Sequence, residues 1–299
     1  MSIEFSVITV NYNGLKYTCE LIDSITFSND MEVIVVDNGT REDEASVIEQ
    51  LYPNVIVIRS NKNLGFAGGN NLGIKAAKGK YLFLINNDTI LDSSFNTKLL
   101  TERLDSQPEI AIVCPKIRFS WSNRPIQFAG YTNLSTITLR NRAIGCGEED
   151  HGQYDFPHPT PYAHGAAMLI KREALEKVGL MPECYFLYYE ELDWSLMFTR
   201  SGYKIWYDPS CTVYHKESQT TGQNSPLRNY YITRNRLLFA QRNVKKPVRW
   251  LTYCYLVGAV ALRDICIFTL KRQTEQRKAI IRGVRDFFVL TKQLHSSMS

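Results

Sequence analysis

Several signals that define a function class are missing from this chain of 299 residues. The seven cysteines form no CxxC pair, which argues against a disulfide framework and against zinc ribbons or fingers. The opening stretch MSIEFSVITVNYNG has no basic segment followed by a long apolar run, so we expect no signal peptide. No internal repeat of solenoid length occurs. A reducing compartment is the simplest setting for such a chain.

The glycine-rich segment 65–73 lacks the spacing of two well-known nucleotide-binding motifs. Its letters GFAGGNNLG do not match GxGxxG, and no Gly-Lys-Ser or Gly-Lys-Thr follows as in a Walker A loop. A Rossmann dinucleotide enzyme and a P-loop NTPase are therefore disfavoured. Two interpretations of the glycines stay open. They present backbone N–H groups to a diphosphate, or they permit tight packing between a strand and a helix.

Charge is distributed unevenly along the chain, although the formal net charge is only +5. Residues 1–225 contain 20 Lys and Arg against 27 Asp and Glu, whereas residues 226–299 contain 15 against 3. The pattern predicts an acidic body over 1–225 and a basic extension over 226–299 that meets an anionic partner, and the residues from 228 onward have a helical pattern. The polar segment 216–226 is the expected boundary. Because the body is acidic and no nucleic-acid motif is present, nucleic acid is not an expected partner.

Short apolar runs alternate with helix-like segments over the first hundred residues. This order is typical of right-handed βαβ units, and it predicts an α/β fold with a mostly parallel central sheet. Residues 116–165 have no helical period and are expected to form irregular strands and loops. The expected strands are Phe5–Val10, Val33–Asp37, Val55–Arg59, Tyr81–Ile85, Ile110–Pro115, Ala166–Ile170, Lys204–Tyr207 and Cys211–Tyr214, and the expected helices include Leu15–Ile25, Asp43–Gln50, Asn70–Ala77, Ser93–Leu104, Arg172–Val178 and Glu190–Ser201.

Polar residues follow the first four expected strands, and ligands of open α/β sheets bind at the carboxyl ends of the strands. Asn11 and Tyr12 follow the first strand, and Asp37 closes the second. Asp37 either caps the next helix or accepts a hydrogen bond from a base or ribose. Asp88, after the fourth strand, is either an Asx-turn residue or a ligand for a divalent cation that also binds phosphate oxygens.

The segment YYEELDW is the densest acidic and aromatic cluster of the chain. On a helix, Glu190 and Asp193 share a face while Glu191 points elsewhere. The three carboxylates either complement the dipole at a helix N-terminus or supply acid–base chemistry. His215 follows an expected strand, where a lone histidine is more often structural than a metal ligand.

Taken together, these segments resemble the family 2 glycosyltransferases, in particular the bacterial rhamnosyltransferase-like branch. The resemblance runs from about residue 5 to residue 239, and two parts of it are the most specific: NLGFAGGNNLG followed by NND, and YYEELDW followed by GYK and VYH. It implies a GT-A fold, in which a nucleotide-binding α/β domain merges with an acceptor-binding half. It also implies inverting transfer of a sugar from a nucleotide-diphosphate donor.

Residue roles follow from the resemblance, position by position. Two positions depart from the common pattern. The NND motif has one carboxylate, and the base position holds Glu191 where many members have Asp, so Glu190 and Asp193 stay candidates for the base. The implied roles are nucleotide-sugar binding by Thr9, Asn11, Tyr12, Asp37, Gly68, Gly69, Asn70 and Asn87, binding of Mg²⁺ or Mn²⁺ by Asp88 and His215, and general base catalysis by Glu191.

The leading hypothesis is transfer of rhamnose from dTDP-rhamnose to a lipid-linked or polysaccharide acceptor of a bacterial surface glycan such as O-antigen or capsule. The alternatives are a UDP-hexose or UDP-N-acetylhexosamine donor, or a non-catalytic assembly partner at the membrane.

The apolar window 251–270 holds Arg263 and Asp264 at its centre, and each charge costs roughly 2.5–3.5 kcal/mol on insertion scales. We therefore expect an interfacial or re-entrant helix rather than a span. The basic residues around it suit an anionic membrane surface or a polyprenyl-diphosphate-linked acceptor. These features predict a cytoplasmic protein, peripheral on the inner face of the cell membrane. The open alternative is a solvated helix that packs on the catalytic domain.

Overall fold

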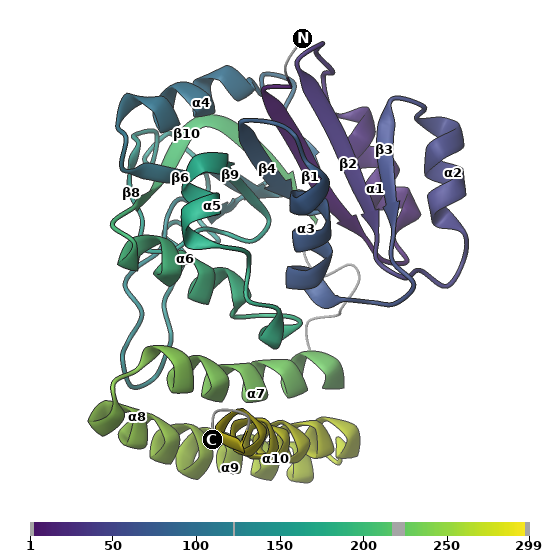
Figure 1. The fold of residues 1–299 in the computed structure, drawn as a ribbon. Helices are drawn as coiled ribbons and strands as arrows, with labels where there is room; N and C mark the ends of the chain where they lie inside the picture. The colour runs from purple at the N-terminus through teal and green to yellow at the C-terminus, as the bar shows by residue number, and fades with distance from the viewer. Residues whose placement is uncertain (1–2, 122, 217–224, 297–299) are drawn as a thin grey trace. The chain divides into compact units, whose positions relative to one another are not determined.

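The computed structural model describes residues 3–121, 123–216 and 225–296, and the chain divides into two compact units (Figure 1). Unit 1 comprises Met1–Thr132, Arg142–Phe186 and Glu190–Thr220. Unit 2 comprises Asn133–Asn141, Leu187–Tyr189 and Thr221–Ser299. Two short segments from the first 225 residues therefore pack with the C-terminal helices. Most of the boundary expected at 216–226 lies outside the described residues.

The first half of unit 1 is a parallel sheet in the order β3-β2-β1-β4. β1, β2 and β4 are almost continuously apolar and are buried on both faces, as the sequence predicts. The strands are β1 (Phe5–Asn11), β2 (Met31–Asp37), β3 (Val55–Arg59) and β4 (Tyr81–Ile85), and the helices between them are α1 (Leu15–Asp23), α2 (Glu44–Leu51) and α3 (Gly65–Ala76).

The second half of unit 1 continues the same sheet as β9-β6-β10-β5. β9 is antiparallel to both β4 and β6, whereas β10 is parallel to β6. The two short strands expected at 204–207 and 211–214 are one strand with an irregularity between Asp208 and Thr212. The elements are β5 (Thr89–Leu91), α4 (Thr97–Ser106), β6 (Ile110–Phe119), β7 (Ile126–Phe128), β8 (His158–Pro159), β9 (Ala167–Lys171), α5 (Arg172–Val178), η1 (Glu183–Tyr185), α6 (Glu190–Arg200) and β10 (Lys204–His215).

The glycines of α3 let this helix lie close to β1. A Cβ atom added to Gly73 would lie 2.4 Å from Ile8 Cγ2, and one added to Gly69 would lie 2.8 Å from Val10 Cγ1. Both separations are shorter than any real contact, so a larger residue would force the helix away from the sheet. Of the two interpretations of the glycine-rich segment, tight strand–helix packing is the one that these two positions show.

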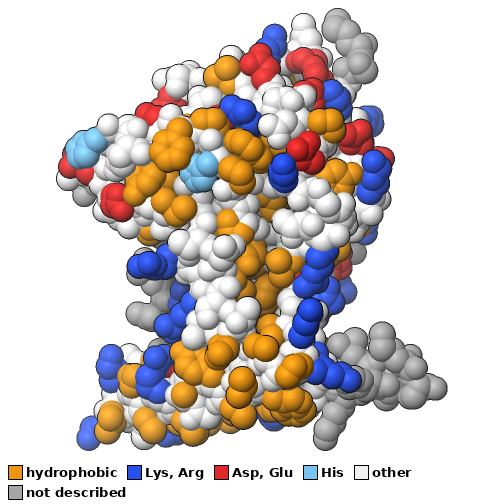
Figure 2. All heavy atoms as spheres, turned by 90° about the vertical axis from the view of Figure 1, so that its left-hand side faces the viewer, with side chains coloured by type: hydrophobic (Ala, Val, Ile, Leu, Met, Phe, Trp, Pro, Cys, Tyr) orange, Lys and Arg blue, Asp and Glu red, His pale blue; other side chains and the backbone are white. Residues whose placement is uncertain are grey.

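Unit 2 is helical. α8 (Lys246–Tyr253), the π-helical segment η2 (Cys254–Ala261) and α9 (Leu262–Leu270) follow one another without a break, between α7 (Pro226–Asn243) and α10 (Thr274–Ser296). The continuous helix 246–270 is long and apolar enough to cross a membrane, on the criteria of length and composition alone. Several large apolar side chains lie exposed on unit 2, and Figure 2 shows orange side chains gathered there beside blue Lys and Arg, in the lower part of the view.

Candidate active site

Hydrogen bonds tie the carboxyl ends of β1 and β4 together in unit 1. The buried Asn11 side chain donates from Nδ2 to Glu44 Oε2 at 2.7 Å, and its Oδ1 accepts from the Thr18 hydroxyl at 2.7 Å. Asn87 Nδ2 donates to the same Thr18 oxygen at 3.0 Å. The predicted site residues Asn11 and Asn87 are therefore brought together, and Thr18 and Glu44 fix their orientation.

The end of β2 is tied to the start of α3 by a residue that the sequence analysis did not single out. The buried Asn38 accepts the Leu64 N–H at 2.9 Å through Oδ1, and its Nδ2 donates to the Gly65 carbonyl at 3.0 Å. Gly65 has a φ of +74°, and a Cβ there would lie 2.2 Å from the Phe186 carbonyl oxygen. The only feature of the sequence that pointed to Asn38 was its position directly after Asp37. The Asp37 carboxylate itself accepts the Thr40 N–H at 3.4 Å.

Asp88 and His215 meet although 127 positions separate them in the sequence. His215 Nε2 lies 3.1 Å from Asp88 Oδ1, and its Nδ1 lies 2.9 Å from Gln127 Oε1. All three side chains are buried. Both contacts are to oxygen acceptors, so a neutral His215 donates either from Nε2 to Asp88 or from Nδ1 to Gln127. In the second tautomer the lone pair of Nε2 and the Asp88 carboxylate are both available to the same cation. Gln127 belongs to the stretch for which only irregular structure was expected.

The Asp88–His215 pair suits a divalent cation that a diphosphate helps to hold. It supplies one carboxylate oxygen and one imidazole nitrogen. Within residues 3–121, 123–216 and 225–296, no group of three or more His, Cys, Asp or Glu side chains could form a site from protein ligands alone. Mg²⁺ and Mn²⁺ are commonly bound through one or two side chains with phosphate oxygens and water completing the shell. The donor set therefore fits a cation that arrives with a diphosphate ligand.

His164 lies near this pair and stays neutral. Its ring centroid is 6.4 Å from that of His215, and its Nδ1 accepts the Ala166 N–H at 3.1 Å. Burial lowers the pKa of His164 to about 3, and its electrostatic interaction with the neighbouring His215 acts in the same direction. A neutral imidazole adds no positive charge beside the candidate cation site. The sequence analysis did not identify His164 as a site residue.

The three carboxylates at the start of α6 differ in their access to solvent. Asp193 is 1% exposed and accepts the Tyr185 hydroxyl at 2.9 Å, and Glu190 is 3% exposed. Glu191 is only half-buried, and its Cγ would lie 3.9 Å from a Cβ added to Gly165. Of the three carboxylates, Glu191 is the most accessible to solvent and therefore to an incoming hydroxyl group. Glu190 and Asp193 are buried together on one face of α6 while Glu191 is on another, as the helical spacing predicts.

The other predicted nucleotide-binding residues have varied settings. Thr9 is fully buried in β1, and its hydroxyl has no hydrogen-bond partner among the residues that the structure describes, while Tyr12 is half-buried. Gly68, Gly69 and Asn70 lie within α3 and not in a loop, because α3 begins at Gly65 and thus earlier than expected. Asn70 donates to the Phe66 carbonyl at 2.9 Å inside that helix. The role of these residues toward a nucleotide stays a prediction.

Comparison with known proteins identifies glycosyltransferases by both a family model and individual relatives. The family model "Glycosyl transferase family 2" matches residues 6–179. The hexosyltransferase Agl10 of low-salt glycan biosynthesis, from Haloferax volcanii, is 25% identical over 85% of this chain and 80% of its own length. The N-acetylglucosaminyl-diphospho-decaprenol L-rhamnosyltransferase of Mycobacterium tuberculosis is 22% identical over 93% and 97%. The dTDP-rhamnosyl transferase RfbF of Shigella flexneri is 26% identical over 81% and 82%.

Solved structures share the fold at lower sequence identity. The mannosyltransferase PcManGT from Pyrobaculum calidifontis, in complex with GDP-Man and Mn²⁺, has a TM-score of 0.58 and 14% identity, with 96% of this chain and 88% of that chain covered. GalNAc-T7 with UDP, GalNAc and Mn²⁺ has a TM-score of 0.61 and 14% identity, with 87% and 57% covered. Both structures contain a nucleotide or nucleotide sugar together with Mn²⁺.

Proposed function

The chain belongs to family 2 of the glycosyltransferases and has the GT-A fold, and from that premise we propose that it is an inverting rhamnosyltransferase. It takes the sugar from dTDP-rhamnose and passes it to a lipid-linked or polysaccharide acceptor of a surface glycan. The proposal concerns the donor, the acceptor and the residues that act. That the chain is a glycosyltransferase rests on the family itself.

One observation carries the catalytic part of the proposal, namely the buried contact between Asp88 and His215 at the carboxyl end of β4. Loss of a nucleoside diphosphate requires that its growing negative charge be neutralised, and a divalent cation beside the diphosphate does this when bound. Asp88 Oδ1 and His215 Nε2 are the protein atoms that would hold the cation. Gln127 keeps the imidazole in the orientation that turns Nε2 toward Asp88.

Glu191 is the proposed general base. Its half-buried carboxylate would accept the proton of the acceptor hydroxyl as the hydroxyl oxygen attacks the anomeric carbon. A single displacement from the face opposite the leaving diphosphate inverts the anomeric centre and needs no covalent intermediate. Glu190 and Asp193, both buried within unit 1, would instead hold the first turn of α6 in place.

The names of the related proteins support the proposed donor and the proposed acceptor. Two of the three named above carry rhamnosyl transfer in their names, one with dTDP and one with a diphospho-decaprenol acceptor. The hexosyltransferase Agl10 keeps a different sugar open as the alternative. The basic extension over 226–299 would suit a polyprenyl-diphosphate-linked acceptor, and such an acceptor would place the protein on the cytoplasmic face of a membrane.

A binding and turnover experiment tests this function. The thermal unfolding of the full-length protein is measured with dTDP-rhamnose, UDP-glucose or UDP-N-acetylglucosamine, each with and without Mg²⁺ or Mn²⁺. A donor at a hundred times its Kd stabilises the native state by about 2.7 kcal/mol. We expect stabilisation by dTDP-rhamnose that requires the cation, and release of dTDP when an acceptor is added.

The Asp88→Asn variant supplies the test of the cation site, because an amide is a poorer ligand of nearly the same shape. It should lose the cation-dependent part of the stabilisation. The control is Asp30→Asn, since Asp30 lies directly before the amino end of β2, whereas Asp88 follows the carboxyl end of β4. Stabilisation by UDP donors alone would overturn the dTDP-rhamnose assignment, and an undiminished cation effect in Asp88→Asn would overturn the role of Asp88.

A further inference from the structure

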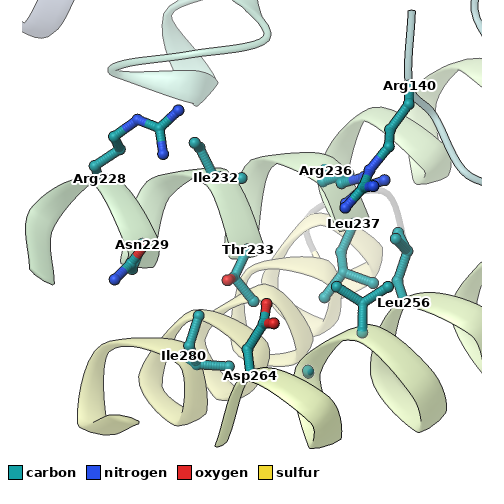
Figure 3. Close-up of a pocket in the computed structure, with 12 residues that line it drawn as sticks. Arg140, Arg228, Asn229, Ile232, Thr233, Arg236, Leu237, Leu256, Asp264 and Ile280 are labelled. Carbon is teal, nitrogen blue, oxygen red and sulfur yellow. The ribbon is translucent and has the colours of Figure 1, made fainter. Parts of the chain in front are cut away.

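Unit 2 contains a cavity of about 170 Å³ that the proposed transfer chemistry does not use. Its charged lining is unbalanced, with Arg140, Arg228 and Arg236 against the single carboxylate Asp264. Figure 3 shows the guanidinium groups of Arg140 and Arg236 side by side at one end of the cavity and Arg228 at the other. The rest of the wall is mostly apolar, formed by Ile232, Leu237, Leu256, Val260, Ala261 and Ile280.

Among the residues that line this cavity, Arg236 has the environment that is least favourable for the stability of the folded protein. It is 7% exposed, and its Nη2 donates to the Thr138 carbonyl. Its Nε is buried and has no hydrogen-bond partner within residues 3–121, 123–216 and 225–296. Burial lowers the pKa of Arg236, and the positive charge of Arg140 acts in the same direction. Across the described parts of the chain, no Asp or Glu oxygen lies within 4.0 Å of the guanidinium nitrogens of Arg140 or Arg236.

A buried, incompletely paired guanidinium group destabilises the protein by itself. Two adjacent arginines without a carboxylate add repulsion to that cost. An anion bound between them would remove both unfavourable contributions. Guanidinium groups bind phosphate oxygens in pairs of parallel hydrogen bonds, so a phosphate or diphosphate is the anion that this arrangement fits.

The apolar side of the cavity indicates that the anion carries a hydrocarbon chain. Leu256, Val260 and Ala261 come from the helix 246–270. The same helix leaves Trp250 and Leu262 largely exposed to solvent. A ligand with an anionic head and a long apolar tail would place its head at the arginines and its first carbons against this wall.

We propose that this cavity binds the diphosphate head and the first carbons of a prenyl-diphosphate-linked acceptor. The inference rests on the proposed function for the identity of the acceptor and adds to it a second diphosphate site, built from arginines and distinct from the Asp88–His215 pair. Arg140 and Arg236 donate to the phosphoryl oxygens. Arg228 adds positive charge at the other end of the cavity.

Direct binding of farnesyl diphosphate to the full-length protein tests the site without any sugar transfer. Affinity is measured by calorimetric titration for the wild type and for Arg140→Gln and Arg236→Met. Removal of one charged hydrogen-bond donor should weaken binding about ten- to a hundredfold. Arg140 is exposed, so the Arg140→Gln variant tests the site even if Arg236→Met impairs folding. The matched control Arg285→Gln removes an exposed arginine of α10 and should leave the affinity unchanged.

Asp264→Asn should change the affinity for farnesyl diphosphate in the direction opposite to the arginine variants. It removes the one negative charge from the lining and should tighten the binding of farnesyl diphosphate, which general damage to unit 2 would not do. Asp88→Asn should bind farnesyl diphosphate as the wild type does, because Asp88 belongs to the transfer site. Weaker binding in Asp88→Asn would place the ligand there and overturn the proposal.

Two further ligands show whether the cavity recognises the diphosphate alone or the diphosphate together with its hydrocarbon chain. Inorganic pyrophosphate should bind more weakly than farnesyl diphosphate, and farnesol should not compete with it. Equal affinities for farnesyl diphosphate and pyrophosphate would refute the role of the apolar wall. Unchanged affinity in both arginine variants would refute the site. Because these titrations contain no nucleotide sugar, intact binding together with absent dTDP-rhamnose turnover would count against the proposed function and leave the cavity assignment standing.

Discussion

Substitution of the α6 carboxylates one at a time separates the proposed base from its neighbours. Glu191→Gln, Glu190→Gln and Asp193→Asn each remove a negative charge with almost no change of shape. If Glu191 is the base, its amide variant should lose about 10²- to 10⁴-fold in kcat, the usual contribution of general base catalysis. That range corresponds to a rise of about 3–5 kcal/mol in the activation barrier.

The same variants should change stability in the reverse order. Glu191 is half-buried, so Glu191→Gln should change the free energy of unfolding by less than about 0.5 kcal/mol. Asp193 is 1% exposed, lies in the first turn of α6 and accepts the Tyr185 hydroxyl. Its charge interacts favourably with the helix N-terminus by about 0.3–1 kcal/mol. Asp193→Asn should therefore lower Tm by about 0.5–2 °C and leave kcat within about tenfold of the wild type.

Initial rates at saturating dTDP-rhamnose and acceptor, measured well below each Tm, give the comparison. Donor affinity from the thermal shift shows whether each variant still binds its substrate. A rate that falls a thousandfold in Asp193→Asn but stays near wild type in Glu191→Gln would refute the argument from solvent access. It would then assign the proton transfer to Asp193.

Two further predictions concern the stability of unit 1. Gly73→Ala should lower the free energy of unfolding, because overpacking against Ile8 costs about 1–3 kcal/mol and exceeds the gain in helix propensity of about 1 kcal/mol. Gly258→Ala, a comparison substitution in η2 of unit 2 where open space surrounds the added methyl group, should be neutral or stabilising in the same denaturant titrations. Burial alone would raise the pKa of Asp150, but hydrogen bonds from Lys116 and a backbone N–H leave that pKa below its usual range. Its contribution to stability is therefore present above the unfolded-state pKa of about 3.9 and lost as pH falls through the lowered pKa, and Asp150→Asn should flatten that acid dependence.

The strands of unit 1 could be predicted from the sequence because their signal is local. Continuous apolar runs such as those of β2 and β4 leave little choice but a buried parallel strand. The start of α3 could not be predicted in the same way, since glycine disfavours helices when judged residue by residue. Contact with β1 overrides that preference at Gly69 and Gly73.

The candidate site was predictable only in part, for a related reason. Asp88 and His215 each have an ordinary structural explanation when taken alone, and their contact depends on the pairing of β10 with β5, which places His215 opposite Thr89. Gln127 and His164 come from segments without a regular period, so no local pattern marked them. The segments 133–141 and 187–189 joined unit 2 through tertiary contacts that no property of their own residues indicates.

The uneven charge of the chain fits a reaction that involves two diphosphates, of which one leaves during the transfer and the other stays attached to its lipid. The diphosphate of the donor must leave, and a cation held by Asp88 and His215 would assist by taking up charge as the bond breaks. The diphosphate of a prenyl-linked acceptor must stay attached. Fixed arginines such as Arg140 and Arg236 would neutralise its charge and hold its position, without the Lewis acid that would activate it as a leaving group. On this argument the cation ligand Asp88 would serve the donor in unit 1, and Arg140 and Arg236 would serve the acceptor in unit 2. The farnesyl diphosphate titrations of the Asp88 and arginine variants test that division directly.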